Sequence, residues 1–492
     1  MIAHPSRRET LLAVFAGLAG VGGSFALAGY SPRFVVAPID ALIVRLTPGP
    51  IVTWMIGNVG EDAHLLHIAL ALAVAVGLLA GIALAGILIA RRLDRPLTGV
   101  GLAGVLAWGL TAAITGQPVL AVGAAVPVSI FTAVGGTPDS SPDEDPSRRR
   151  VLQSGAAALA FAGVSIGVGR LTTDAGFSST DSETERSPEV TRLLQQAEAQ
   201  SLDLATDDLP GLVSTIRRFY GVDINEFDPE IEASDWSLTL SGTVEDDVTI
   251  TFDELTDRPT EHRYVTLRCV GESLNGNQMD TAVWTGTPIK PLLEAADPTG
   301  GCGCAMLRAE DGYFVQFPLE ALEDAFLAWG MNGKALPTSH GHPVRVLVPG
   351  HWGETNVKWL DEIELLEEET DGYWEQRGWH GTGPVHTVAK LWADTTLEDG
   401  RIELAGHAYA GTRGIERVEV STDGGSTWHD AQLSEPLPGE DVWRQWRYVF
   451  EATGPREVVV RATDGDGTLQ PRESSGSFPS GATGWVTKTV EP

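Results

Sequence analysis

The segment MNGKALP at residues 331–337 is followed by HGHPVR at 340–345, VPG at 348–350 and NVKWL at 356–360. These segments place imidazole, guanidinium and ammonium groups on loops whose paths are restricted by glycine and proline. Such groups bind phosphate or another anion through charge-assisted hydrogen bonds. The alternative is that they only balance local carboxylates. Because basic residues are scarce here and acidic ones abundant, we favour an anion site.

A cysteine lies upstream of these segments, in VTLRCVG at residues 265–271. A free cysteine at the end of an apolar strand is usually buried and inert. Cys269, however, precedes loops rich in anion-binding groups. This context makes a functional role for the residue more plausible than its position on the strand alone would.

The order and spacing of these segments resemble the molybdopterin domain of the sulfite oxidase family. The resemblance includes the TL.CV context of Cys269 and a Trp-x-Gly at 284–286, and it covers residues 219 to about 379. Residues 406–470 resemble the family's C-terminal immunoglobulin-like domain, above all in the hairpin GIERVEVSTDGGSTW at 414–428.

Carried over residue by residue, the resemblance implies that Cys269 is the catalytic thiolate ligand to molybdenum. A soft sulfur ligand suits a metal already held by two dithiolene sulfurs. The resemblance also implies a set of residues around the pterin and its phosphate: Phe219, Tyr220, His340, Arg345, Asn356, Val357 and Lys358.

Three departures from the family pattern concern the substrate pocket. Sulfite-oxidising members have arginines just after the cysteine, where this chain has VGESLNG at 270–276. They have a tyrosine where this chain has Trp329, and an arginine where it has Glu354 and Thr355. A pocket that is acidic or neutral at these positions makes sulfite a doubtful substrate. A neutral sulfoxide or another oxo acceptor fits at least as well.

Several aromatic and histidine side chains flank the matched motifs and are candidate pocket residues. The competing interpretation is that they pack in the core, since a histidine beside an aromatic ring is commonly a hydrogen-bonded core residue. The candidates are Trp329, His351, Trp352, Trp379 and His380.

Apolar stretches of about 20 residues predict membrane-spanning helices. Five are expected: Thr10–Tyr30, His64–Ala90, Leu97–Thr115, Pro118–Gly135 and Val151–Gly169. If all five span, arginine clusters at residues 7–8, 91–95 and 148–150 lie on one side. The positive-inside rule then places the N-terminus in the cytoplasm and everything after Arg170 outside a multi-pass cell-membrane region. This helical front also resembles membrane-bound members of the family.

The junction SRRRVLQ at 147–153 resembles a twin-arginine export signal, which carries folded domains across a membrane. The alternative is three ordinary inside-positive arginines. His64 and His67 lie on one face of one predicted helix, whereas a haem in a bundle needs ligands on facing helices, so we do not expect haem.

The expected architecture is therefore multidomain. It consists of an all-α transmembrane bundle, an α+β sulfite-oxidase-type molybdopterin domain and an immunoglobulin-like β-sandwich. The expected boundaries are residues 1–145 for four transmembrane helices, 146–170 for the twin-arginine-like motif and a fifth helix, 171–212 for an acidic Ser/Thr-rich tether, 213–382 for the molybdopterin domain and 383–492 for the sandwich.

Charge is distributed unevenly along the chain. The part up to Arg170 has 11 basic and 9 acidic residues, whereas the remainder has 23 basic and 57 acidic residues. This acidity argues against a nucleic acid partner and is typical of a salt-loving host. Besides Cys269 the chain has only Cys302 and Cys304, in GGCGCAM at 300–306. We expect them to be small loop residues rather than a disulfide or half of a metal site.

The leading hypothesis is an extracytoplasmic molybdenum-cofactor oxidoreductase. It would transfer an oxygen atom to or from a small sulfur or other oxo compound, and exchange electrons with a separate membrane or soluble redox partner. One rival is a membrane-tethered binding protein that uses its sandwich domain, and another is a sulfoxide-type reductase fed from the quinone pool. The resemblance also permits a homodimer through the C-terminal domain.

Overall fold

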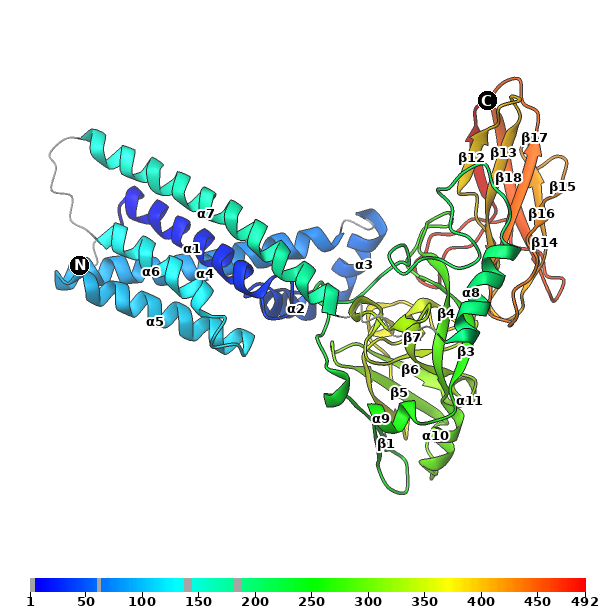
Figure 1. The fold of residues 1–492 in the computed structure, drawn as a ribbon, viewed down its shortest axis with the longest axis horizontal. Coiled ribbons are helices and arrows are strands. Elements are labelled where there is room, and N and C mark those ends of the chain that lie inside the picture. The colour runs from blue at the N-terminus through cyan, green and yellow to red at the C-terminus, as the bar shows by residue number, and fades with distance from the viewer. Residues whose placement is uncertain (1–4, 60–62, 137–143, 180–186) are drawn as a thin grey trace. The chain divides into compact units, whose positions relative to one another are not determined.

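The computed structural model describes residues 5–59, 63–136, 144–179 and 187–492, which form two compact units (Figure 1). The first unit contains the described residues of 1–47, 59–181 and 223–230. The second contains 48–58, the described residues of 182–222, and 231–492.

The first unit is a helical bundle, as expected. Its helices are α1 (Arg7–Ala28), α2 (Ala37–Leu46), α4 (Ala63–Leu93), α5 (Pro96–Thr115), α6 (Val122–Gly136) and α7 (Glu144–Ser179). Local sequence sets their ends. Ser6 and Glu9 form a capping box at the start of α1. Pro96 begins α5, and Gly116 ends it in the left-handed conformation at φ 67°.

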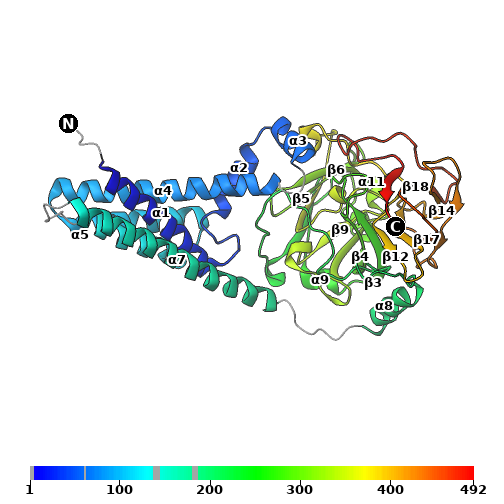
Figure 2. The same ribbon diagram turned by 90° about the horizontal axis from the view of Figure 1, so that it is seen from above.

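Small residues allow close helix packing and reveal the directions of the helices (Figure 2). Gly23 of α1 faces Gly123 of α6 so closely that a Cβ on Gly23 would lie 2.1 Å from the Gly123 carbonyl oxygen. Gly155 and Gly169 of α7 lie against Phe15 and Phe25 of α1 in the same order, so α7 runs parallel to α1. The chain therefore leaves α7 at the end of the bundle opposite to its entry into α1.

Among the residues that the structure describes, four helices are long and apolar enough to cross a membrane: α1, α4, α5 and the stretch Gln153–Thr172 of α7. The number is five if the broken pair Ala37–Leu46 and Gly49–Ile56 counts as one span. The expected fourth span, Pro118–Gly135, is shorter: α6 has 15 residues and an internal proline, Pro127. It nevertheless packs inside the bundle against α1 and α5. The side chains of 141–152, and with them those of the twin-arginine-like motif, lie outside the described residues.

The two ends of the bundle differ in their polar contacts. At the end where α1 begins, Arg91 at the end of α4 forms an ion pair with Glu9. At the opposite end, Tyr30 donates a hydrogen bond to Glu226 (2.5 Å), and Arg33 pairs with Glu230 at 2.8 Å. Between the helices, His67 of α4 binds buried Asp40 of α2 through Nδ1 (2.6 Å), so its ring is engaged by a carboxylate.

The second unit begins with two five-stranded sheets, which pack around separate apolar clusters. The first sheet has the order β2-β1-β10-β5-β6, with β1 (Ser237–Gly242), β2 (Val248–Thr251), β5 (Cys304–Ala309), β6 (Phe314–Pro318) and β10 (Leu360–Leu365). The other has the order β3-β4-β7-β8, with β9 on β7; its strands are β3 (Glu261–Arg268), β4 (Met279–Pro288), β7 (Phe326–Met331), β8 (Lys334–Ala335) and β9 (Arg345–Leu347). Short helices connect the strands: α9 (Phe252–Thr256), α10 (Lys290–Ala295), α11 (Leu319–Leu322) and the 3₁₀ turns η2 (Ala233–Asp235), η3 (Thr338–His340), η4 (Gly353–Thr355) and η5 (Glu375–Arg377).

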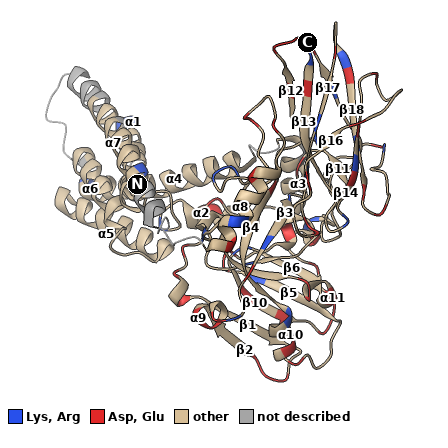
Figure 3. Ribbon diagram, turned by 45° about the vertical axis from the view of Figure 1, so that its right-hand side comes forward, with Lys and Arg blue, Asp and Glu red and all other residues tan. Residues whose placement is uncertain are grey.

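A β-sandwich completes the unit, as expected. One sheet contains β11 (Val388–Ala389), β12 (Ala393–Thr396), β13 (Ile402–Tyr409), β16 (Gln432–Leu433) and β17 (Arg444–Phe450). The other contains β14 (Ile415–Ser421), β15 (His429–Asp430), β18 (Arg456–Asp464) and β19 (Val486–Val490). Its core is formed by inward-facing residues of both sheets, among them Leu404, Trp446, Val418 and Val460. Figure 3 shows acidic residues spread over the ribbon of this unit, whereas α4 and α5 are almost free of charged residues along their length.

Part of the expected tether at 171–212 is packed rather than free. Residues 180–186 lie outside the described residues, but α8 (Pro188–Gln200) buries Val190, Leu193 and Ala197. Beyond it, the buried Leu212 accepts a hydrogen bond from the Trp443 indole (2.9 Å) through its carbonyl. The polar composition suggested a tether because the apolar positions of α8 are few and widely spaced.

Two further features differ from expectation. Helix α3 (Gly49–Asn58), between two predicted spans, packs with the second unit: Thr53 donates to the Arg377 carbonyl (3.3 Å), and Ile56 lies near Gly271. Cys302 and Cys304 are joined in a disulfide at the start of β5. The expectation that they are two free small residues is therefore wrong, because the loop brings the two sulfurs together.

Candidate functional site

Cys269 directly follows β3 and is the one free cysteine of the three in the chain. Its backbone N–H donates to the Gln278 carbonyl (3.0 Å), which fixes the turn between β3 and β4. The backbone N–H groups of Gly271 and Glu272 point at its sulfur. The residue as a whole is half-buried.

The surroundings of Cys269 favour the neutral thiol. Burial, together with the negative charges of Glu272 and Glu354, raises the pKa of Cys269 to about 12. A thiol of this kind is a poor nucleophile at neutral pH, whereas a bound metal cation deprotonates a coordinating thiol. The site is therefore better suited to metal ligation than to nucleophilic catalysis.

Aromatic side chains line the region next to the cysteine. Phe219 stacks on Tyr220 (ring centroids 5.6 Å apart) and meets His340 edge-on at 5.4 Å. The Tyr220 hydroxyl lies against Gly353, where a Cβ would be 2.7 Å away. The negative charge of a Cys269 thiolate raises the pKa of Tyr220, although burial is the larger cause. Phe219 and Tyr220, predicted from the sequence, therefore lie in one place with His340 and Cys269.

A cationic cradle adjoins these rings and consists of His340, Arg345 and Lys358. Arg345 donates to the carbonyl oxygens of His340 (3.1 Å) and Asn356 (2.7 Å), and Lys358 donates to that of Ser339 (2.7 Å). Gly341 makes this convergence possible at φ 105°, because a Cβ there would lie 3.0 Å from Lys358 and 3.1 Å from Arg345.

Electrostatics of the cradle suit an anion. Burial lowers the pKa of His340 to about 3, and the positive charges of Lys358 and Arg345 contribute. His340 is consequently neutral at neutral pH beside two cations. A phosphate placed here would be stabilised by both cations and by an imidazole N–H.

The side chains of Asn356 and Val357, two of the predicted cofactor-binding residues, support the fold instead. The Asn356 amide accepts from the Val348 N–H (2.8 Å) and donates to the Trp352 carbonyl (3.0 Å), so it fixes the loop. Val357 is 1% exposed and packs in the core. Any role of these two in binding would fall to their backbone.

The five predicted pocket residues separate into two regions. Trp329 and His351 lie with the core of the first sheet; His351 packs edge-on against Phe317 at 4.9 Å. Trp352 and Trp379 are buried in the same apolar cluster as Val270, next to Cys269. His380 is exposed.

The acidic residue after the cysteine is not a pocket group. Glu272 is buried, and one carboxylate oxygen accepts hydrogen bonds from Arg268 Nε (2.8 Å) and from Lys390. The other accepts from the Gln278 N–H (3.0 Å). Arg268 and Lys390 are themselves fully buried. The expectation of an acidic pocket position at 270–276 is therefore wrong for Glu272, which instead connects β3 to the sandwich.

Glu354 does bring acidity to the site. Both of its carboxylate oxygens, and both of those of Glu375, are buried without a hydrogen-bond partner among the described residues. Burial raises the pKa of Glu354 to about 8, with a contribution from the charge of Glu375. The sequence pointed to Glu354 by its place in a motif, whereas Glu375 carries no sequence signal.

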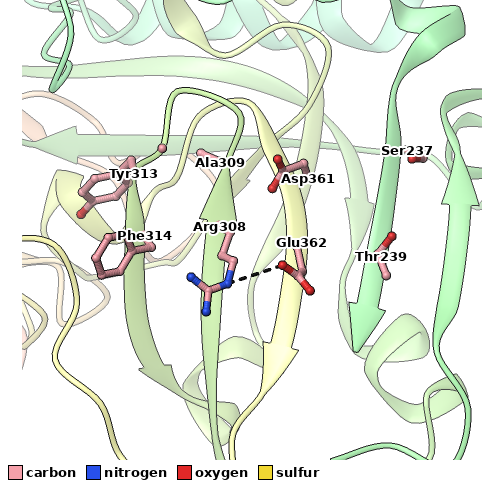
Figure 4. A pocket seen from close by; sticks show the side chains of 9 residues that line it. Ser237, Thr239, Arg308, Ala309, Tyr313, Phe314, Asp361 and Glu362 are labelled. Carbon is pink, nitrogen blue, oxygen red and sulfur yellow. Dashed lines mark ion pairs between the residues drawn. The ribbon is translucent and has the colours of Figure 1, made fainter. Parts of the chain in front are cut away.

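A groove of about 430 Å³ lies on the first sheet, lined by Ser237, Thr239, Arg308, Tyr313, Phe314 and Asp361 among others (Figure 4). Arg308 forms ion pairs there with Glu362 (3.5 Å) and Glu364 (2.5 Å). The groove does not include Cys269. It is linked to the candidate site through Tyr313, whose hydroxyl donates to the Glu354 carbonyl (2.9 Å).

Comparisons with known proteins match both parts of the second unit. Residues 225–374 match the oxidoreductase molybdopterin binding domain, and residues 385–480 match the Mo-co oxidoreductase dimerisation domain. Mitochondrial sulfite oxidase of Rattus norvegicus is 28% identical over 288 residues, which are 46% of this chain and 51% of the relative.

Relatives with two different names are similar to this chain. Sulfite oxidase of Arabidopsis thaliana is 28% identical over 301 residues, covering 48% of this chain and 76% of the relative. Nitrate reductase [NADH] of Spinacia oleracea is 26% identical over 317 residues, which cover 50% of this chain and 34% of the relative. The chain spans about half the length of the mammalian relatives that it matches.

Proposed function

Since this chain belongs to the sulfite oxidase family of molybdopterin-dependent oxidoreductases, we propose that it is a membrane-anchored enzyme of oxygen-atom transfer. Its substrate is a small neutral oxo compound, such as a sulfoxide, and its electrons are exchanged with a separate redox partner. The observation that carries the proposal is that Cys269 lies beside the aromatic and cationic groups of the cradle.

The residues present fit a molybdenum-pterin cofactor. Arg345 and Lys358 would hold the phosphate, since the absence of a side chain at Gly341 lets these two residues come close together. Burial, with the charges of both cations, lowers the pKa of His340, which stays neutral beside them. Phe219 and Tyr220 offer stacked rings for the pterin. Cys269 supplies the thiolate for molybdenum. When bound, the cofactor supplies a metal centre that gives or takes an oxygen atom with two electrons.

This chain's own groups hold the cofactor and shape the pocket. The backbone N–H groups of Gly271 and Glu272 stabilise a charged Cys269 sulfur. Arg268, which directly precedes the cysteine, is held away from the pocket by Glu272 and by the carbonyl oxygens of His386 (2.9 Å) and Ala482 (3.3 Å). It therefore does not serve as a binding group for an anionic substrate.

Pocket charge supports a neutral substrate over sulfite. Glu354 and Thr355 stand where a sulfite-oxidising member would have an arginine. The Glu354 carboxyl interacts with Cys269, and Glu375 interacts with Glu354. A sulfite dianion brought there would find no compensating cation, because Arg268 is engaged by Glu272 and no arginine stands at 354 or 355. A neutral sulfoxide needs no such cation.

A direct assay tests this function. The full chain is purified with its cofactor and assayed in both directions: sulfite with an oxidising dye, and sulfoxides with a reduced dye. We expect turnover of a neutral oxo compound with kcat/KM at least about 100-fold above that for sulfite, equivalent to about 2.7 kcal/mol of discrimination. Efficient sulfite oxidation would contradict the substrate class, and turnover of nothing would favour the tethered binding protein.

We further propose that the bundle anchors the enzyme in the cell membrane with the catalytic unit outside. Arg91 pairs with Glu9 at the end where α1 begins, so Arg7, Arg8, Arg91 and Arg92 gather at one end of the bundle. The positive-inside rule assigns this end to the cytoplasm. Because α7 runs parallel to α1, the chain after Ser179 emerges at the opposite end.

Protease accessibility tests the orientation. Protease added outside intact cells should release a soluble fragment that begins after residue 179 and contains Cys269. Protease added to inverted vesicles should leave this fragment intact. The reverse pattern would contradict the orientation. The match of residues 385–480 to a dimerisation domain supports a homodimer through the sandwich, which the size of the released fragment also reports.

A further inference from the structure

We propose that Glu354, assisted by Glu375, is the acid that exchanges a proton with the oxygen transferred at the Cys269 site. This inference rests on the proposed function. It assigns a role to Glu354, which lies at a position where the chain departs from the family pattern. The two carboxyls come from η4 and η5, and Glu354 is two residues before Asn356 of the cradle loop.

Geometry places the Glu354 carboxyl next to the cysteine loop. A Cβ on Gly381 would lie 2.4 Å from Glu354 Oε1 and 2.9 Å from the Val270 side chain, so Gly381 is flanked by both. A Cβ on Gly353, the residue before Glu354, would lie 3.1 Å from the Arg268 carbonyl oxygen. The η4 turn therefore packs directly on residues 268–270, and the Glu354 side chain lies beside this segment.

No hydrogen bond from the described residues accounts for the burial of these carboxyls. A buried carboxyl normally has a hydrogen-bond donor or a cation, because burial without one costs free energy. The Glu354 carbonyl accepts from Tyr313, yet neither carboxylate oxygen of Glu354 or Glu375 has a partner among the described residues. A group kept in this state is typical of a functional site.

Proton balance requires such a group. Reduction of a neutral oxo compound XO consumes two electrons and two protons: the X–O bond breaks, and two O–H bonds form to give water. The redox partner supplies the electrons. The protons must arrive where the oxygen leaves, and two neighbouring carboxyls can deliver them and be reprotonated from solvent. In the reverse reaction, the carboxyls of Glu354 and Glu375 accept the protons of water.

The charges around Glu354 set the pH range in which it can act as an acid. Glu354 interacts with Glu375, Cys269 and Tyr313, and Glu375 also interacts with Asp371 and His380. Burial and Glu375 raise the pKa of Glu354 to about 8, so Glu354 is protonated at neutral pH and can act as an acid. Activity in the reductive direction should fall as pH rises through this value.

The test uses the cofactor-loaded full chain with Glu354→Gln, Glu375→Gln and the control Glu362→Gln, which lies in the groove of Figure 4 and outside the site. We expect Glu354→Gln to lower kcat about 100-fold with little change in KM, and to abolish the pH dependence near neutrality. Glu362→Gln should match the wild type.

Infrared difference spectroscopy gives a readout independent of turnover. A protonated carboxyl band that titrates near pH 8 should disappear in Glu354→Gln and persist in Glu362→Gln. Glu375→Gln removes a like charge next to Glu354, so the titration of the Glu354 carboxyl should move to lower pH. This result does not depend on how well Glu354→Gln binds the cofactor.

Two results overturn the proposal while leaving the proposed function intact. One is an active wild type together with a Glu354→Gln variant whose kcat is within threefold of the wild-type value. The other is a carboxyl titration that is the same in the wild type, in Glu354→Gln and in Glu375→Gln. A wild type that turns over no oxo compound overturns both the proposed function and this inference.

Discussion

Cys269→Ser is expected to leave a folded, membrane-bound protein that has lost more than about 100-fold of its oxygen-transfer activity. Changes to the residues that support a metal ligand typically cost 10-fold to 100-fold in affinity or activity, and replacing the ligand itself should exceed this. Serine has nearly the same shape as cysteine, and Cys269 keeps its backbone bond to Gln278. The fold should therefore be unaffected.

The loss should separate ligation from folding. Circular dichroism and the unfolding midpoint of Cys269→Ser should match those of the wild type, while molybdenum retention and activity fall. The disulfide-bonded Cys302 and Cys304 lie at the start of β5, in the other sheet, and a double Cys302→Ser/Cys304→Ser variant is the matched control that should keep full activity. Equal activity of Cys269→Ser and wild type would contradict the assignment.

Glu272→Gln is expected to destabilise the second unit by about 3–5 kcal/mol, because it removes the shared anion from the buried Arg268 and Lys390. Two uncompensated cations would then remain in the interior. Urea unfolding of the detergent-solubilised chain, followed by tryptophan fluorescence, measures this loss.

Lys390→Met provides the control and should change stability by less than about 1 kcal/mol. It leaves the Arg268–Glu272 pair balanced, and the Gly276 carbonyl keeps its bond from Trp392 (3.0 Å). Burial, opposed by Glu272, lowers the pKa of Lys390 to about 8. Below that pH the charged amine is costly in the folded state, so its removal relieves a penalty. A larger loss in Lys390→Met than in Glu272→Gln would contradict the arrangement.

The sequence was sufficient to predict the groups that lie close together along ordered motifs. His340 ends η3, Arg345 begins β9 and Lys358 lies just before β10, and the glycines between them restrict the path of the chain. Cys269 was predicted because it precedes these loops in a recognisable context. The alternation of apolar residues likewise predicted the sandwich, since inward-facing positions repeat every second residue.

Contacts between distant segments could not be predicted in this way. Lys390 is 118 residues from Glu272, and no local pattern indicates that they share a buried ion pair. Helix α3 is too short and too apolar to be distinguished from a piece of membrane helix by composition alone. The unpaired state of Glu354 and Glu375 depends on what surrounds them in three dimensions, which a single sequence does not contain.

Metal analysis combined with electron paramagnetic resonance of the purified full chain, beside Cys269→Ser, tests the central claim most directly. We expect about one molybdenum per chain and a Mo(V) signal that the substitution alters or abolishes. A well-folded wild-type protein without molybdenum, or a Mo(V) signal that is the same with and without the Cys269 sulfur, would contradict the account and favour a tethered binding module.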